Sequence, residues 1–169
     1  TSGDSTNSYC FDYLFDFATG EPIPWADKVS TFSSSATDMG FMVVPTADTV
    51  RLNYLMDKLV QNQVQVMFVG GAGTGKTVLV SDYLSGLSNN NDSYKFTNIN
   101  MNFYTDSASL QNQLEQSIDK RSGKTYGPPG NSKLVYFIDD LNLPFVETYG
   151  TQTPIALMRQ HIDHGQWFD

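Results

Sequence analysis

Residues 70–77 have the sequence Gly70-Gly71-Ala72-Gly73-Thr74-Gly75-Lys76-Thr77, and this stretch decides the expected fold. It matches the phosphate-binding pattern G-x-x-x-x-G-K-[ST], whose glycines let the chain turn tightly and direct backbone N–H groups at phosphate oxygens. In this pattern Lys76 reaches the β- and γ-phosphates, and the Thr77 hydroxyl ligates Mg²⁺. All eight residues are therefore predicted to bind ATP or ADP with Mg²⁺. A glycine-rich turn with an exposed lysine is the weaker alternative.

The segments on both sides of the loop fit a strand–loop–helix unit. The short apolar run Val64–Val69 predicts a strand before the loop. Apolar residues at helical spacing predict a helix that starts at the loop, with an inner face made of Leu79, Val80, Tyr83, Leu84 and Leu87. A similar stripe predicts a preceding helix, with a core face made of Leu52, Leu55, Met56, Leu59 and Val60.

Strands and helices continue to alternate downstream. Phe96–Phe103 alternates between two faces and predicts a strand, and the apolar run Leu134–Ile138 predicts a buried strand. Between them, Asp106 or Ser107 is expected to cap a helix. The apolar side of that helix carries Leu110, Leu114 and Ile118. Strands alternating with helices predict an α/β fold with a mainly parallel sheet, of which three core strands are present.

Two further segments complete this part of the chain. Gly123–Asn131 contains Pro-Pro-Gly and is expected to be a loop. The last helix is expected to have Thr153 as its cap and Pro154 in its first turn. Its buried face is expected to consist of Ile155, Met158 and Ile162.

The N-terminal third has a different composition. Tyr9–Phe17 alternates and is rich in aromatic residues, a turn follows at residues 18–21, and a second extended stretch includes Ile23 and Trp25; together they predict a β-hairpin. Residues 1–8 form a polar tail, and Ser30–Gly40 is rich in Ser and Thr, as linkers are. The expected division is therefore residues 1–42 for tail, hairpin and linker, and 43–169 for the phosphate-binding domain.

Two carboxylates follow the apolar strand that ends at Ile138. An apolar strand that ends in acidic residues, downstream of a phosphate loop, is typical of the Walker B element. Asp139 would hold the metal, directly or through water, and Asp140 would orient or activate the attacking water. The alternative is a strand that simply leaves the core through a polar turn.

Composition excludes several functions. The net charge of -8 and the lack of a basic run disfavour nucleic-acid binding. No apolar run is long enough to cross a membrane. The single cysteine, Cys10, has no internal disulfide partner and is typical of a reducing compartment. His161 and His164 form a weak metal pattern and are interpreted as a surface pair.

Several longer runs resemble the third AAA+ module of an axonemal dynein heavy chain, with the outer-arm type most similar. They are Val44-Pro45-Thr46 with Thr49-Val50-Arg51, the phosphate loop, Tyr126–Gly130, Leu134–Pro144, Tyr149–Gln152 and Leu157–His161. The resemblance begins near Tyr9 and covers nearly the whole chain. It implies a P-loop NTPase core of the AAA+ type, preceded by the hairpin and truncated after the third core strand.

The resemblance also implies roles that the residues alone do not give. Val44 and Pro45 would lie near the adenine, and Asn102 would contact the catalytic carboxylate; the alternative for Asn102 is a strand-end side chain that bonds its own turn. The expected partners are neighbouring AAA+ modules of the same heavy chain, dynein intermediate and light chains, and microtubules, in the axoneme of a cilium or flagellum. Neither nucleic acid nor membrane is expected. Sensor residues, the helical lid and an arginine finger would lie beyond Asp169.

One departure from the AAA+ pattern concerns the second Walker B acid. Most active AAA+ sites have Glu as the second Walker B acid, where this chain has Asp140. The shorter side chain retracts the carboxylate, and a displacement of about 1 Å can lower a rate by about 10²-fold. A slowly hydrolysing regulatory ATPase is therefore the favoured function. A structural module that holds nucleotide without significant hydrolysis is the alternative, and a small-molecule phosphotransferase is a distant third.

Overall fold

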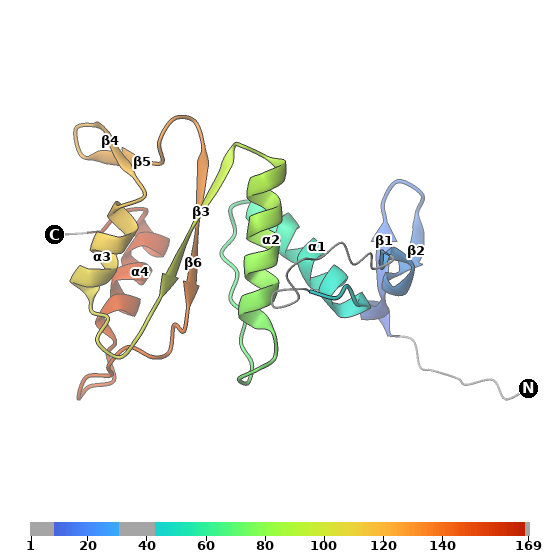
Figure 1. Ribbon diagram of the computed structural model, residues 1–169, viewed down its shortest axis with the longest axis horizontal. Coiled ribbons are helices and arrows are strands. Elements are labelled where there is room, and N and C mark those ends of the chain that lie inside the picture. The colour runs from blue at the N-terminus through green and yellow to red at the C-terminus, as the bar shows by residue number, and fades with distance from the viewer. Residues whose placement is uncertain (1–8, 31–42, 168–169) are drawn as a thin grey trace, which may run out of the picture. The chain divides into compact units, whose positions relative to one another are not determined.

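A computed structural model describes residues 9–30 and 43–167, which belong to two compact units that divide between Tyr83 and Leu84. The predicted polar tail at residues 1–8 and nearly all of the predicted linker lie outside the described residues. The ribbon in Figure 1 shows the elements of each unit. The proposed domain boundary at residues 42 and 43 remains a prediction.

The first unit begins with the predicted hairpin. Strand β1 (Tyr13–Asp16) pairs antiparallel with β2 (Glu21–Pro24), and short 3-10 turns flank them at Cys10–Asp12 and Trp25–Lys28. In the register, Tyr13 lies opposite Pro24 and Phe15 lies opposite Pro22. The hairpin is confirmed, although its strands are shorter than the alternating stretch suggested.

Two helices follow along the chain, and the second of them crosses the division between the two units. Helix α1 (Ala47–Gln61) buries Met56, whereas Leu55 and Leu59 of the predicted core stripe are exposed. Helix α2 (Lys76–Asn90) begins at the phosphate loop, as predicted, and buries Leu79, Val80 and Leu84. The Tyr83 hydroxyl contacts the Asp57 carboxylate at 3.2 Å and so links α2 to α1.

The predicted strand at Val64–Val69 is wrong. These residues belong to no strand, and Met67 and Val69 are 70% and 83% exposed. An extended segment becomes a strand only when its N–H and C=O groups pair with those of a neighbour. None of the described strands pairs with this segment. The apolar composition of residues 64–69 therefore suits a buried strand, but composition alone does not provide the neighbouring strand that hydrogen bonding requires.

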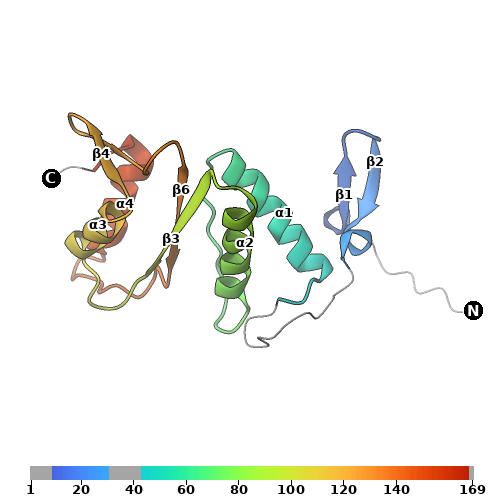
Figure 2. The ribbon, with the colours of Figure 1, turned by 45° about the horizontal axis from the view of Figure 1, so that its top comes forward.

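The second unit contains a parallel pair of strands. Strand β3 (Tyr94–Asn100) pairs with β6 (Lys133–Asp139), with Tyr94 opposite Lys133 and Asn100 opposite Asp139. Helices α3 (Ser107–Glu115) and α4 (Thr153–His164) cover one face of this pair, as Figures 1 and 2 show. The buried core between them consists of Ile99, Met101, Leu110, Leu114 and Leu157. Two of the three predicted core strands are thus present, and the α/β class is confirmed.

The faces of β3 follow the predicted alternation. Ile99 and Met101 are each 2% exposed, whereas Asn98 and Asn100 lie on the exposed face. The strand itself ends at Asn100 rather than continuing to Phe103. The period-2 pattern was therefore a reliable guide to which residues enter the core.

Helix α4 differs from its prediction at both ends. Its N-cap is Gln152 rather than Thr153, which is already helical, while Pro154 lies in the first turn as predicted. Ile162 is 56% exposed, and Leu157 is buried in its place. Five residues at 100° each separate Leu157 from Ile162, which places Ile162 well away from the core-facing side.

The predicted loop at Gly123–Asn131 contains part of a second hairpin. Strand β4 (Asp119–Ser122) pairs antiparallel with β5 (Thr125–Gly127), and Gly123 takes a positive φ of 57° in the turn. Arg121 Nη2 donates to the carbonyl oxygens of Pro128 and Gly130, both at 2.8 Å. The guanidinium crosses Gly127 so closely that a Cβ there would lie 2.7 Å from Arg121 Nε. Arg121 thus holds a segment whose glycines and prolines suggested an irregular loop.

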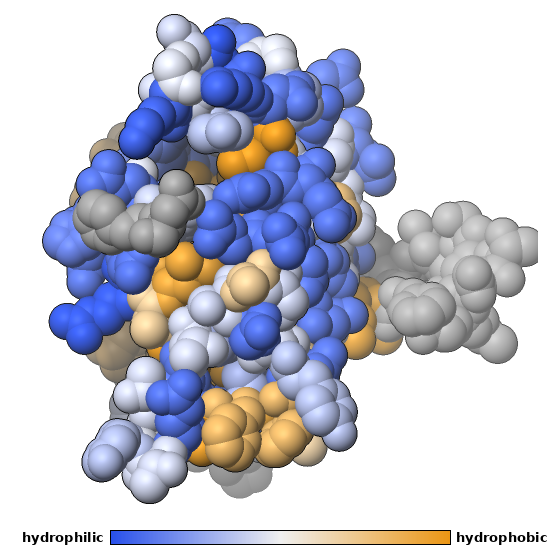
Figure 3. Space-filling model, turned by 90° about the vertical axis from the view of Figure 1, so that its left-hand side faces the viewer, coloured by the Kyte–Doolittle hydropathy of each residue, from blue (hydrophilic) through white to orange (hydrophobic). Residues whose placement is uncertain are grey.

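Figure 3 shows one face of the molecule, on which hydrophilic residues predominate and apolar patches interrupt them. In the part of the chain that the structure describes, every helix is too short or too polar to span a bilayer.

Candidate functional site

The phosphate loop holds its own lysine. Lys76 Nζ donates to the carbonyl oxygens of Gly70 at 3.0 Å and Gly71 at 2.6 Å, and to Thr74 Oγ1 at 3.1 Å. Thr74 Oγ1 in turn donates to the Gly71 carbonyl at 3.0 Å. These contacts bring the two ends of the loop together around the ammonium group. The loop is therefore a closed turn in which the only charged group is the one predicted to bind phosphate.

Backbone conformation explains two of the loop's glycines. Gly73 and Gly75 have φ values of 74° and 80°, a region that residues with a Cβ rarely adopt. Helix α2 then starts at Lys76, and its first helical bond joins Leu79 N to the Gly75 carbonyl at 2.9 Å. The first N–H groups of a helix have no partner inside it, so the loop ends where free donors gather. Thr77 lies in this first turn and is exposed.

The predicted adenine-side residues precede α1. Val44 is exposed and Pro45 is half-buried, and Thr46 directly after them caps the helix. Thr46 Oγ1 accepts from Thr49 N at 3.2 Å, and Thr49 Oγ1 accepts from Thr46 N at 2.7 Å. This reciprocal capping fixes the end of α1 next to Val44 and Pro45. Contact with adenine stays a prediction.

The acidic strand end lies in the second unit. Asp139 is the last residue of β6, opposite Asn100, and its carbonyl oxygen accepts from Met101 N at 3.1 Å. Its Oδ1 accepts from Asp140 N at 2.9 Å, which fixes the half-buried carboxylate at the carboxyl end of the strand. Ligands of α/β proteins bind at this end of parallel strands.

Asp140 has an unusual backbone conformation. Its φ is 55°, in the left-handed region, and its carbonyl oxygen accepts from Leu143 N at 3.0 Å in a tight turn. Asp and Asn are the side-chain-bearing residues best suited to this region, because a short polar side chain can bond locally. A Glu is less suited to it. The backbone therefore gives a physical reason for Asp rather than Glu at this position.

Asn102 lies at the same edge, two residues after β3 ends. Its Oδ1 accepts from Tyr104 N at 2.9 Å, and its own N–H donates to Thr105 Oγ1 at 3.0 Å. The side chain thus makes the turn-forming bond that was the alternative for this residue. Register places Asn102 beside the acidic end of β6, and its contact with a catalytic carboxylate remains a prediction.

Sequence reasoning missed Thr105. It is 7% exposed and joins Asn102 through two bonds, since Thr105 N also donates to the Asn102 carbonyl at 3.1 Å. The three-residue spacing of a polar strand end and a Thr was the available signal. Thr105 therefore fixes the backbone around Asn102.

Two other polar residues of α4 make side-chain contacts. Arg159 Nε pairs with Asp163 Oδ2 at 3.2 Å in an exposed ion pair. His161 packs against the Trp167 ring, with centroids 4.6 Å apart. Within residues 9–30 and 43–167, no three His, Cys, Asp or Glu side chains gather as metal ligands would.

The described titrating groups near the core respond to burial and capping. Desolvation raises the pKa of Tyr136, whose hydroxyl donates to the Leu114 carbonyl at 2.7 Å. The N–H and hydroxyl of Ser109 lower the pKa of Asp106, the N-cap of α3. Both groups support the elements around the strand end rather than the strand end itself.

Comparison with known proteins extends these observations. Residues 33–169 match the family described as the P-loop containing dynein motor region. The chain is 48% identical over 160 residues to dynein axonemal heavy chain 17 of Homo sapiens, 45% to a ciliary dynein beta chain of Heliocidaris crassispina, and 41% over 159 residues to a flagellar outer-arm dynein beta chain of Chlamydomonas reinhardtii.

Each alignment covers 94% of this chain but only 3–4% of the relative. The chain thus corresponds to a small part of a very long motor polypeptide in each case. The matched region includes the phosphate loop, the acidic strand end and both helices of the second unit. From its loop, its strand end and these matches, the chain belongs to the family of P-loop-containing dynein motor regions.

Proposed function

We propose that this chain is the nucleotide-binding part of the third AAA+ module of an axonemal dynein heavy chain of the outer-arm type. In this proposal it binds ATP or ADP with Mg²⁺, hydrolyses ATP slowly and regulates the motor. The phosphate loop carries the proposal, because it combines two glycines with positive φ, the start of helix α2 and a lysine in one short segment. The ammonium group of Lys76 now donates to three oxygens of the loop, so phosphate would have to replace at least one of them.

The loop residues have distinct roles in this proposal. Phosphate oxygens would accept from backbone N–H groups of Gly71–Lys76 and of the first turn of α2. Lys76 would reach the β- and γ-phosphates while staying close to the carbonyl oxygens that it now contacts. Thr74 holds Lys76 from the side and would limit its freedom.

Thr77 and Asp139 fit a magnesium ion in chemistry. Both offer oxygen, the ligand type that Mg²⁺ prefers, and one oxygen of Asp139 is already fixed by Asp140 N. When bound, the ion neutralises phosphate charge and orients the terminal phosphoryl group. Asp139 would hold it directly or through water, and Thr77 through its hydroxyl.

Asp140 and Asn102 would act on the attacking water. Asp140 would orient or activate it, and Asn102 would contact that carboxylate, which requires the amide to leave or share its bond with Tyr104 N. The short side chain of Asp140 on a left-handed backbone favours slow hydrolysis. Slow turnover suits a module whose bound nucleotide biases its neighbours rather than one that drives every step.

The heavy chain supplies the proposed partners. Neighbouring AAA+ modules would contact this one, and microtubules and the dynein intermediate and light chains would be reached through the full-length protein. The names of the relatives, axonemal, ciliary and flagellar dyneins, support a place in the axoneme. The net charge of -8 supports the exclusion of nucleic acid as a partner.

A structural module that holds nucleotide without significant hydrolysis is the second candidate. The short side chain of Asp140 on its left-handed backbone favours this structural module over a fast ATPase, because it would hold the carboxylate away from the attacking water. Single-turnover hydrolysis in a motor that contains this module separates the two. A rate that falls in Asp140→Asn supports the regulatory ATPase, whereas a rate unaffected by Asp140→Asn or Asp140→Glu supports the structural module.

Nucleotide binding itself is tested by titrating the chain with Mg-ATP and Mg-ADP. Saturable binding is expected for the wild type and for Lys124→Ala, a matched lysine in the turn of the second hairpin. Lys76→Ala should weaken it by about 100-fold or more, because a charged group that contacts phosphate is removed. A folded wild-type chain that binds neither nucleotide would refute the proposal for this chain.

A further inference from the structure

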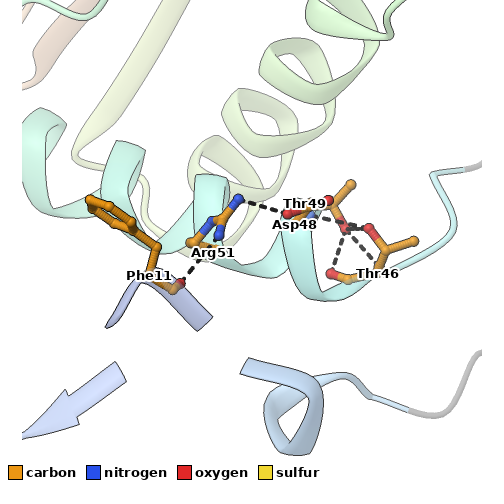
Figure 4. A network of polar contacts seen from close by, with 5 residues as sticks. All are labelled: Phe11, Thr46, Asp48, Thr49 and Arg51. Atoms are coloured by element: carbon orange, nitrogen blue, oxygen red, sulfur yellow. Dashed lines mark hydrogen bonds and ion pairs between the residues drawn. The ribbon is translucent and has the colours of Figure 1, made fainter. Parts of the chain in front are cut away.

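Helix α1 carries one face of polar and aromatic residues that contacts the two 3-10 turns flanking the N-terminal hairpin, Cys10–Asp12 and Trp25–Lys28. Arg51 Nη1 donates to the Phe11 carbonyl at 3.2 Å, and Arg51 Nη2 pairs with Asp48 Oδ1 at 2.7 Å. Figure 4 shows Arg51 between the backbone at Phe11 and the first turn of α1. The Arg51 side chain is 31% exposed, against 76% for Asp48. Arg51 therefore acts as a bridge rather than as a solvated surface charge.

A second contact joins α1, one helical turn further along, to the 3-10 turn Trp25–Lys28 on the other side of the hairpin. Trp25 is 6% exposed, and its ring lies 5.4 Å from the ring of Tyr54. Tyr54 follows Arg51 by three residues and so shares its face of α1. Lys58 Nζ lies 5.4 Å from the Tyr54 ring centroid on that face. The 3-10 turn on each side of the hairpin thus contacts α1, which holds both ends of the hairpin to the helix.

The bridged end of α1 is the end next to Val44 and Pro45. Thr46 and Thr49 cap the helix there, and Asp48 and Arg51 belong to the same first turns. Figure 4 shows the capping bonds and the Arg51 bridge in continuous succession along the helix. Movement of the hairpin would therefore displace the capped turn to which Val44 and Pro45 are attached.

We propose that Arg51 is a positioning residue, which couples the N-terminal hairpin to recognition of the nucleotide base by fixing the segment that contains Val44 and Pro45. This inference rests on the proposed function and adds a route by which the site is regulated. The hairpin in its docked position favours base binding, and its release lowers affinity for the nucleoside part of the ligand. The phosphate grip of Lys76 is not altered.

The test compares a ligand with a base to one without. Arg51→Ala should raise the Kd for Mg-ADP about five- to tenfold, as expected for loss of a charge-assisted bond, and leave the Kd for Mg-pyrophosphate unchanged. Arg51→Lys should restore part of the ADP affinity, because one ammonium group reaches either the Phe11 carbonyl or Asp48 but lacks the planar fork that joins both. Trp25→Phe should resemble Arg51→Lys.

Two controls separate this inference from the proposed function. Lys76→Ala should weaken ADP and pyrophosphate together, and Arg159→Ala, which removes an arginine from an exposed ion pair, should change neither. Equal weakening of both ligands by Arg51→Ala, or unchanged ADP affinity, would overturn the coupling while nucleotide binding stands. Failure of the wild type to bind either ligand would overturn the proposed function and the coupling with it.

Hydrogen exchange gives a readout that does not need a ligand. In Arg51→Ala, backbone amides of the hairpin and of residues 46–50 should exchange faster than in the wild type. Amides of β3 and β6 should be unchanged. Unchanged exchange at the hairpin would contradict the bridge itself.

Discussion

The phosphate loop and the acidic strand end are built by different means. The side-chain hydrogen bonds of Lys76 and Thr74 in the loop join residues no more than six positions apart. The strand end is placed by pairing β6 with β3 across about 40 residues of chain and by two helices packed on that pair. The conformation of the loop depends on the loop's own residues, whereas the position of the strand end depends on the packed core beneath it. Different substitutions should therefore disrupt the loop and the strand end.

The largest effect is expected from a core substitution that destabilises the strand end and leaves the loop intact. Leu110 is fully buried beneath β3 and β6. Leu110→Ala should lower the free energy of unfolding of the second unit by about 3 kcal/mol, through lost burial and a cavity. Urea denaturation monitored by hydrogen exchange at residues 94–100 and 133–139 measures it. The matched substitution Leu55→Ala removes a side chain that is 47% exposed and should have a much smaller effect. A similar loss in both variants would contradict the assigned core.

The Mg²⁺ dependence of ATP binding separates the role of the strand end from that of the loop. Asp139→Asn should weaken binding of Mg-ATP by about ten- to hundredfold, because an amide replaces a charged oxygen ligand. Binding of ATP in the presence of EDTA should remain as in the wild type, since the loop residues are intact. Titrations with and without Mg²⁺ measure the difference, with Asp119→Asn as the control. Equal weakening under both conditions would show that Asp139 supports structure rather than metal.

Sequence predicted the loop much better than its setting. The loop motif is contiguous, so its turn and the start of α2 follow from adjacent residues, whereas the bonds of Lys76 to the loop carbonyls were not predicted. Val64–Val69 failed because strand formation needs a partner that the run itself does not encode. The hairpin at residues 119–127 was missed because its strands are short and polar, and Arg121 of β4 then holds the following Pro-Pro-Gly segment through hydrogen bonds to Pro128 and Gly130.

The strand end was predicted in identity but not in conformation. The apolar run that ends at Ile138 predicted a buried strand, and the two acids that follow it in the sequence, Asp139 and Asp140, were therefore predicted to lie at its end. The left-handed backbone of Asp140 and the turn bond of Asn102 come from how the chain leaves the sheet. Helix α4 shows the same limit, because its buried residues, Pro154 and Leu157, each lie one position before the predicted Ile155 and Met158.

Backbone strain gives a smaller test of the same contrast. Gln63 and Asp140 are the two non-glycine residues with positive φ in the described ranges, at 59° and 55°. Gln63→Gly, just after α1, should stabilise the chain by about 0.5–1 kcal/mol, because relief of the left-handed strain exceeds the added entropy of the unfolded chain. Asp140→Gly should gain less, since Asp tolerates this conformation. Thermal unfolding measures both, and a larger gain at Asp140 would contradict the reason given for its residue type.

The smallest expected effect concerns acid. Asp106 caps α3 through Ser109 N at 2.8 Å, and this bond lowers its pKa below the ordinary 3.8. A carboxyl with a lowered pKa in the folded state contributes stability above its unfolded pKa, and that contribution is lost as the pH falls through the folded value. The advantage of the wild type over Asp106→Asn should therefore be constant above about pH 5 and shrink below pH 4. Melting temperatures between pH 3 and 7 measure it, and an advantage that grows with acid would reverse the sign.

The prolines of the N-terminal hairpin have a consequence for solubility. Proline has no N–H, so the ladder bonds between β1 and β2 must come from the rows that pair Leu14 with Ile23 and Asp16 with Glu21. The alternate positions of β2, whose amides would point to its outer edge, are Pro22 and Pro24. The β2 edge therefore cannot donate hydrogen bonds to an incoming strand from another molecule, which disfavours edge-to-edge aggregation on that side of the hairpin.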